Sequence, residues 1–225
     1  MERESSLSGR VVLLTGEGDV AAAVTGRLRS HGARVALAGP AAASAPLAAA
    51  PGAPDLALPC GHGDLAELGR AVDTVIESFG RLDHLVHLVG SRPQAGLLME
   101  LDPLALRDVL DRALVTPLAC VQRAYWRWMA AHGGSVVHVL VHTARRDGPQ
   151  DTALAGLTEL TEWLAAELAP RVDVHAIVPS PSLTPGAYRA GVTDVLCDLL
   201  TRRMNPAQGP VLVLSEELTC PSRAA

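Results

Sequence analysis

The sequence predicts one α/β domain over residues 1–225, built as a doubly wound parallel sheet of about seven strands, with three helices on each face. Short apolar, partly β-branched runs alternate with longer segments whose apolar residues recur at helical spacing. Helices of this length between strands require right-handed crossovers, which make neighbouring strands parallel. A length of 225 residues suits one domain, and no internal repeat divides it.

The first strand-turn-helix unit sets the pattern for the rest. Val11–Leu14 reads as a buried strand, and Gly16 and Gly18 supply turn conformations before an amphipathic helix. Gly16–Ala21 fits the loose G-x-G-x-x-G/A fingerprint of Rossmann-like dinucleotide sites, in which backbone N–H groups hold a pyrophosphate. Glu17 and Asp19 place two carboxylates at that position, so we expect Gly16 and Gly18 to be the vestige of a cofactor loop.

The remaining elements follow in order. Further strands are expected at 34–38, 56–58, 84–89, 135–141, 172–178 and 211–214, and helices at 64–79, 103–130, 152–168 and 193–203. Asp64 is a suitable N-cap for the second helix, and Pro117 predicts a kink in the long third one. Residues 40–54 contain four prolines among alanines, which exclude a long regular helix and predict a surface segment.

Composition excludes several classes of protein. A net charge of −5 gives no reason to expect nucleic acid as a partner, and no apolar run approaches the roughly 20 residues of a membrane span. The polar N-terminal residues are unlike a signal peptide, so a cytoplasmic location is expected. The four cysteines lack C-x-x-C spacing and indicate neither a zinc site nor a disulfide framework. All 19 basic residues are arginine, which with abundant Ala, Gly and Pro is typical of a GC-rich genome such as an actinomycete's.

Five short motifs occur in the order of one known family. They are Leu-Ser-Gly-Arg-Val at 7–11, Phe-Gly-Arg-Leu-Asp at 79–83, Gly-Gly-Ser-Val-Val at 133–137, Leu-Ala-Ala-Glu-Leu at 164–168, and Ala-Ile-Val-Pro at 176–179 followed by Thr184. With them the chain resembles the short-chain dehydrogenase/reductase superfamily over nearly its full length. The resemblance implies the Rossmann-like fold and, in ordinary members, hydride transfer with NAD or NADP.

The family's cofactor motifs are missing from their expected positions. The later glycines of the T-G-x-x-x-G-x-G opening fall on Val20 and Ala22, and the adenine-contacting Asp falls on Gly61. The second strand ends in Ala38-Gly39-Pro40, without the Asp or Arg that reads the adenosine ribose. The N-N-A-G stretch has become His87-Leu88-Val89-Gly90. We therefore expect no cofactor.

The family's catalytic residues are missing as well. Alignment places its tyrosine at Gln150, its lysine at Leu154, its serine at Val141 and its asparagine near Ala113. The chain has two tyrosines, Tyr125 and Tyr188, and no lysine to lower the pKa of a phenol. The substrate lid that usually follows the conserved Thr184 is nearly absent. These departures predict that no catalytic residue carries over from the family.

Histidines offer an alternative chemistry. His87 ends the fourth strand, and His138 and His142 belong to the fifth, so their imidazoles gather near the vacated cleft. A metal site is not expected, because His138 and His142 stand ~13 Å apart on an extended strand. Acid/base catalysis by His87, His138 or His142, with a small molecule in the cleft, stays open.

Two functions are therefore compared. The first is a non-catalytic partner subunit of an active short-chain oxidoreductase in specialised or lipid metabolism, joined to that paralogue or to a second copy through helices 103–130 and 152–168. Its support is a second apolar line, Leu160 and Trp163, beside the core-facing line of the later helix. The second is a cofactor-independent cyclase, isomerase or dehydratase that reuses the cleft.

Overall fold

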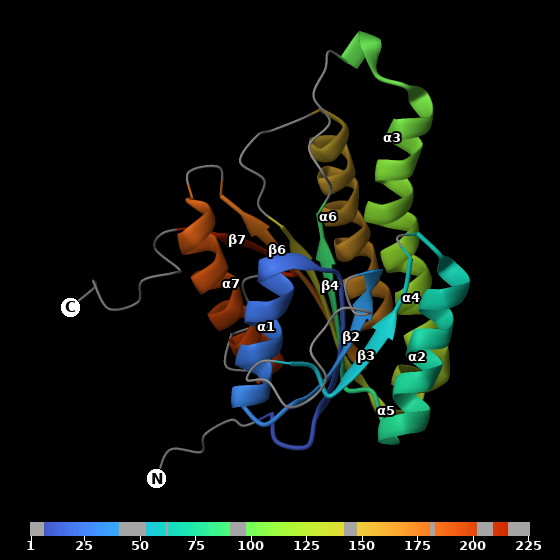
Figure 1. Cartoon of the computed structure of the whole chain (residues 1–225), viewed down its shortest axis with the longest axis vertical. Helices are drawn as coiled ribbons and strands as arrows, with labels where there is room; N and C mark the ends of the chain where they lie inside the picture. The colour runs from blue at the N-terminus through green and yellow to red at the C-terminus, as the bar shows by residue number, and fades with distance from the viewer. Residues whose placement is uncertain are drawn as a thin grey trace, which may run out of the picture.

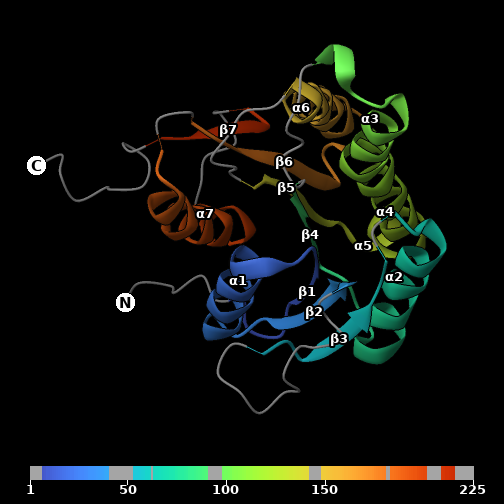
Figure 2. The same cartoon turned by 45° about the horizontal axis from the view of Figure 1, so that its top comes forward.

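The strands form one parallel sheet in the computed structural model, which describes residues 7–40, 53–61, 63–90, 98–141, 148–180, 183–201 and 209–215. The strand order is β3-β2-β1-β4-β5-β6-β7, and all six pairings are parallel (Figures 1 and 2). The strands are β1 Val11–Thr15, β2 Arg34–Gly39, β3 Leu56–Pro59, β4 His84–Val89, β5 Gly134–Leu140, β6 Val172–Pro179 and β7 Val211–Leu214. This confirms the predicted doubly wound, Rossmann-like α/β fold.

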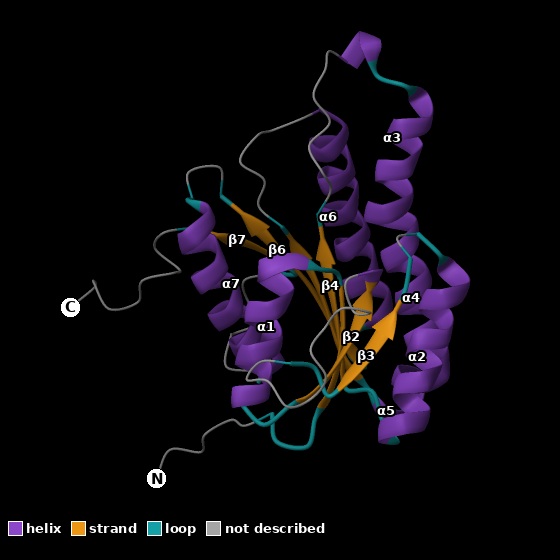
Figure 3. Ribbon diagram, in the orientation of Figure 1, coloured by secondary structure: helices purple, strands orange, loops and turns teal. Residues whose placement is uncertain are grey.

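Helices cover both faces of the sheet (Figure 3). On one face α1 (Gly18–Ser30) lies beside α7 (Pro185–Leu200), and both pack on a common apolar cluster. On the other face lie α2 (Leu65–Phe79), a long composite helix over 103–132, and α6 (Gly148–Leu168). The prediction of three helices on each face is therefore wrong for the first face within the described residues. Most of the 40–54 segment, residues 41–52, lies outside them.

The composite helix contains two turns of π-helix. It consists of α3 Pro103–Leu110, η3 Asp111–Val115, α4 Thr116–Ala124, η4 Tyr125–Met129 and α5 Ala130–His132, after a short η2 at Leu98–Glu100. Pro117 has no N–H to donate to the carbonyl of residue 113, and the π-helical turn η3 lies directly before it. The irregularity that Pro117 predicts in this helix is thus accompanied by a π-helical turn, whose extra residue rotates the helix that follows.

Local signals explain where the helices begin and end. The Asp64 carboxylate accepts a hydrogen bond from the Glu67 N–H at 2.8 Å, and Gly80 ends α2 in the left-handed conformation (φ 73°), as the sequence predicts. The start predicted for α7 at residue 193 is wrong. Thr184 caps this helix by accepting from the Ala187 N–H, and Pro185 occupies its first turn, where proline is favoured.

The helix α6 packs against the composite helix within the same chain. A Cβ at Gly156 would lie 3.2 Å from a methyl carbon of Leu114, so the two helices approach closely there. Leu160 is half-buried between two core clusters, whereas 68% of Trp163 is exposed. The two residues of the predicted second apolar line therefore differ: Leu160 packs within the chain's own core, whereas Trp163 stays largely exposed to solvent. None of the described helices is both long and apolar enough to cross a membrane.

Candidate functional site

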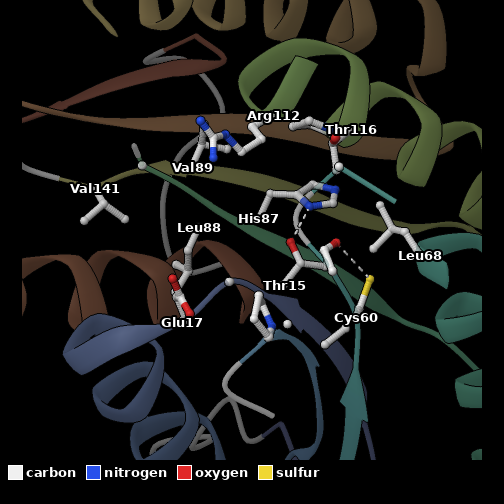
Figure 4. Close-up of a pocket in the computed structure, with 18 residues that line it drawn as sticks. Thr15, Glu17, Cys60, Leu68, His87, Leu88, Val89, Arg112, Thr116 and Val141 are labelled. Atoms are coloured by element: carbon white, nitrogen blue, oxygen red, sulfur yellow. Dashed lines mark hydrogen bonds between the residues drawn. The ribbon is translucent and has the colours of Figure 1, made fainter. Parts of the chain in front are cut away.

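A cleft of about 510 Å³ opens at the carboxyl ends of β1, β2, β4 and β5 (Figure 4). The strand order reverses between β1 and β4, and open α/β sheets bind ligands at such a switch point. The cleft is lined by Thr15 and Gly39, which end β1 and β2. It is also lined by His87, two residues before the end of β4, and by Val141, which directly follows β5. Arg112 reaches the cleft from the composite helix. The fold therefore places the candidate site where the sequence predicts a dinucleotide cleft.

Close packing of strand ends accounts for two of the glycines. Gly16 has φ +130°, and a Cβ there would lie 2.7 Å from Cβ of Leu88. A Cβ at Gly39 would lie 2.5 Å from the Gly16 carbonyl oxygen. Gly18, the first residue of α1, has φ +84°, a conformation that favours glycine, although no atom lies within 4 Å of the position that a Cβ would take. Backbone geometry alone thus requires the glycines of the expected cofactor loop, with no phosphate needed to explain them.

The two carboxylates of the glycine turn lie differently. Glu17 lines the cleft as the N-cap residue of α1, and its side chain makes no capping hydrogen bond. Asp19 does not line the cleft, and its carboxylate forms an ion pair with Arg189 at 3.8 Å. Glu17 therefore supplies negative charge to this end of the cleft, whereas Asp19 faces solvent.

Small and apolar residues form the β2 side of the cleft. Ala38 and Gly39 are buried at the end of β2, and the Cys60 thiol follows β3. Burial and the neighbouring Glu67 raise the pKa of Cys60, and its S–H donates to the Gly61 carbonyl oxygen at 3.6 Å. This side carries no carboxylate or guanidinium among the lining residues that the structure describes.

The residues that the family resemblance sets at the catalytic positions are apolar or carry an amide. Val141 lines the cleft, Ala113 is buried, and Leu154 packs against an apolar cluster. Gln150 is buried in the first turn of α6. Tyr188 is buried in the α1/α7 cluster, where its hydroxyl donates to the Leu140 carbonyl and burial raises its pKa.

Two of the three candidate histidines are brought together. The rings of His87 and His138 stack with their centroids 5.5 Å apart. His87 Nδ1 lies 2.7 Å from the Thr15 hydroxyl, and His138 Nδ1 lies 2.9 Å from the Thr161 hydroxyl. His87 lines the cleft and His138 does not. His142 lies outside the described residues.

Burial keeps both stacked imidazoles neutral. Desolvation, assisted by the neighbouring His138, lowers the pKa of His87 well below 6.5. Desolvation lowers the pKa of His138 to about 4. The Nε2 atoms of both rings are buried without a hydrogen-bond partner within the described structure. No three His, Cys, Asp or Glu side chains of the described residues are grouped as metal ligands.

Sequence reasoning missed Arg112 and Thr116, which both line the cleft. They are four residues apart, a spacing that places side chains on one helical face. If the segment is read as one uninterrupted α-helix, its apolar pattern places neither residue on the helix face that packs on the sheet. Arg112 lies within the π-helical turn η3 and Thr116 directly follows it, so the helical phase changes here, and Pro117 is the sequence signal of this irregularity.

Comparisons with known proteins agree with this architecture. A family model described as enoyl-(acyl carrier protein) reductase matches residues 17–206. Over 200 residues the chain is 31% identical to D-threitol dehydrogenase of Mycolicibacterium smegmatis, a match covering 82% of this chain and 74% of that protein.

Solved structures show the same fold at lower identity. A short-chain dehydrogenase/reductase from Serratia marcescens superposes with a TM-score of 0.75 at 24% identity, covering 95% of this chain and 99% of that one. Hydroxysteroid dehydrogenase from Escherichia coli gives 0.75 at 16% identity, covering 94% and 97%. The strand order, the cleft at its switch point and these matches together show that the chain belongs to the short-chain dehydrogenase/reductase superfamily.

Proposed function

We propose that this member of the superfamily does not transfer hydride and serves as a non-catalytic subunit beside an active short-chain oxidoreductase. The partner binds the outer face of the composite helix and α6, with a second copy of this chain as the alternative occupant. The setting is cytoplasmic, in specialised or lipid metabolism. The observation that carries the proposal is the replacement of every proton-transfer residue at the cleft.

The lining of the cleft does not fit a nicotinamide dinucleotide. Glu17 repels a pyrophosphate from the α1 N-terminus, where the helix dipole would otherwise attract it. Leu88 packs directly against the turn at Gly16. Ala38 and Gly39 give a ribose hydroxyl no carboxylate to bind. The negative charge of Glu17, the space filled by Leu88 and the missing hydrogen-bond partner for the ribose therefore all favour the loss of cofactor binding.

Hydride transfer also needs a group that exchanges a proton with the substrate oxygen near neutral pH. Val141, Ala113 and Leu154 have apolar side chains, and the Gln150 amide does not titrate. The chain contains no lysine to hold a tyrosine near its phenolate form. The early start of α7 at Pro185 leaves little chain for a lid that would exclude water from a reaction.

Exposed aromatic residues support the subunit role. Trp163 on α6 is 68% exposed and Trp126 on the composite helix is 77% exposed, and Val115 of the composite helix is also exposed. Val115 and Trp126 are eleven residues apart, about three helical turns, so they lie near one side of their helix. Burying each indole would contribute about 3 kcal/mol before the entropy cost of association. An active relative that covers these residues would gain this free energy.

Titration with NAD, NADH, NADP and NADPH tests the loss of cofactor binding. We expect no saturable heat or nicotinamide fluorescence change, while an active dehydrogenase of the superfamily gives both under the same conditions. Saturation below about 100 μM, which corresponds to roughly 5.5 kcal/mol, would contradict the proposal.

Light scattering tests the subunit role. The full chain is measured alone and mixed with short-chain dehydrogenases from its native host. We expect a complex with one active relative that Trp163→Glu dissociates, while Val213→Glu, which charges an exposed position on β7, leaves it intact. Catalytic rate of the relative, with and without this chain, is the second readout. No complex and no effect on rate would refute the subunit role.

One observation favours the alternative, a cofactor-independent cyclase, isomerase or dehydratase. The His87 ring lines the cleft and its buried Nε2 has no partner in the described structure. Such an enzyme would convert a substrate without nicotinamide, and His87→Gln would abolish that turnover. The subunit role predicts that His87→Gln leaves complex formation unchanged.

A further inference from the structure

Three polar groups lining the cleft have buried atoms without hydrogen-bond partners in the described structure. They are Nε2 of His87, Oγ1 of Thr116 and Nε of Arg112. Buried polar groups in folded proteins are nearly always paired, because an unpaired one has lost its hydration without gaining a hydrogen bond in return. Three residues that carry such atoms line one cavity, which indicates a ligand that the protein side chains do not themselves replace.

Two of these groups are hydrogen-bond donors, and the third, His87 Nε2, is a donor in one of the two neutral tautomers. The guanidinium Nε of Arg112 is only a donor, and the Thr116 hydroxyl has a proton to give. When the Thr15 hydroxyl donates to His87 Nδ1, the ring proton resides on His87 Nε2, which is then a donor too. A group that accepts without donating satisfies all three, which is the property of carboxylate and phosphate oxygens.

The charges of the cleft agree with this chemistry. Glu17 and Arg112 are the charged residues that line the described part, and Figure 4 shows them on opposite sides, with Glu17 beside α1. Arg112 uses its terminal NH2 group to contact Asp108 at 3.3 Å, and Asp108 is largely exposed. Its Nε has no hydrogen-bond partner within the described structure, and an anion is attracted to this side and repelled from the glycine turn.

Apolar side chains complete the walls. Leu68, Val89, Pro117 and Val141 line the same cavity, whose volume of about 510 Å³ lies in the range of small-molecule sites. We propose that Arg112, Thr116 and His87 bind the carboxylate or phosphate group of a small molecule whose apolar body packs on these residues. This inference rests on the proposed loss of dinucleotide binding, because a dinucleotide would occupy the same cleft.

Binding is tested on the full chain by calorimetry with benzoate and phenyl phosphate, and with benzamide as the neutral counterpart of benzoate. We expect both anions to bind saturably and benzamide to bind about tenfold more weakly or worse, because charge-assisted hydrogen bonds are roughly twice as strong as neutral ones. The stronger of the two anions identifies the ligand class as carboxylate or phosphate.

Matched variants locate the site. Arg112→Met is expected to raise the dissociation constant by about tenfold or more, and Thr116→Val by a smaller factor. Arg107→Met is the control, because Arg107 lies on the same helix and pairs with Asp111 without lining the cleft. Long-range ¹H–¹⁵N spectra should show the His87 proton on Nε2 and a shift of that signal when benzoate is added.

The outcomes separate this inference from the proposed function. The anion site is overturned if neither anion binds saturably, or if Arg112→Met and Arg107→Met bind the anion with equal affinity. A His87 proton on Nδ1 removes His87 from it. Saturable NADH binding together with Arg112-dependent anion binding overturns the loss of cofactor while supporting the anion site. NADH binding without anion binding overturns both.

Discussion

Acidification should destabilise the protein well above the pH at which its carboxylates titrate. The pKa of His138 is about 4 in the folded state against an ordinary value of 6.5, because the ring is buried. The unfolded chain therefore binds more protons than the folded one between these pH values, and stability falls as pH falls through this window. The full effect is about 3 kcal/mol below pH 4, and about 2 kcal/mol is already lost at pH 5.

His87 acts in the same direction, since its pKa is also lowered by burial. Asp83 acts at lower pH. Its hydrogen bonds with Arg81, Val11 and Arg10 outweigh burial and lower its pKa below the ordinary 3.8, so the stability it contributes is lost only in stronger acid. Burial also lowers the pKa of His175, so the loss between pH 7 and pH 5 reports on three histidines, His87, His138 and His175.

Urea unfolding followed by circular dichroism at fixed pH values from 8 to 5 measures this effect. The wild-type free energy of unfolding should fall by about 1 kcal/mol per pH unit or more below pH 6. His138→Leu keeps the volume of the ring approximately and removes its titration, so its slope should be clearly smaller. A flat wild-type profile between pH 7 and pH 5, or equal slopes in both proteins, would refute the conclusion that these rings are neutral and desolvated.

Four further substitutions test the packing of the fold. Asp83→Ala should lower the free energy of unfolding by about 3 kcal/mol in urea denaturation, because the buried carboxylate accepts from the Val11 N–H and two arginines. Gly39→Ala should lower the free energy of unfolding by about 1–3 kcal/mol, because the new Cβ would lie 2.5 Å from the Gly16 carbonyl oxygen. Gly69→Ala is the control: it lies in open space on α2, and it should raise the free energy of unfolding by about 0.5–1 kcal/mol. Trp163→Glu should change it by less than about 0.5 kcal/mol, because the indole is mostly exposed; a loss of several kcal/mol would assign Trp163 to the core instead.

Strands and helix caps were predictable because their signals are local. The bounds of β4, His84–Val89, agree with the apolar run in the sequence, and those of β7, Val211–Leu214, do likewise. Asp64 and Gly80 delimit α2 for the same reason. The helix α7 begins earlier than predicted because its regular apolar spacing starts well after its N-terminus, where Thr184 and Pro185 instead carry a strong start signal.

The site was harder to predict because its contacts are not local. The position of His87 at a strand end was enough to place it in the cleft, since parallel strands end at one edge. Its stacking on His138 depends on the register between β4 and β5, which pairs the two residues directly. Arg112 and Thr116 entered the cleft through a π-helical turn, whose phase change no periodic pattern contains.

The protonation state of His87 bears on the choice between the two functions. A general base works best when its pKa lies near the working pH, and burial moves the pKa of His87 well below 6.5. The part of the cleft that the structure describes gives His87 no carboxylate to raise its basicity, because its Nδ1 faces a threonine hydroxyl. A neutral imidazole of weak basicity is nevertheless a good hydrogen-bond donor. The environment of His87 therefore favours ligand binding over proton abstraction, and it agrees better with a non-catalytic subunit than with a cofactor-independent enzyme.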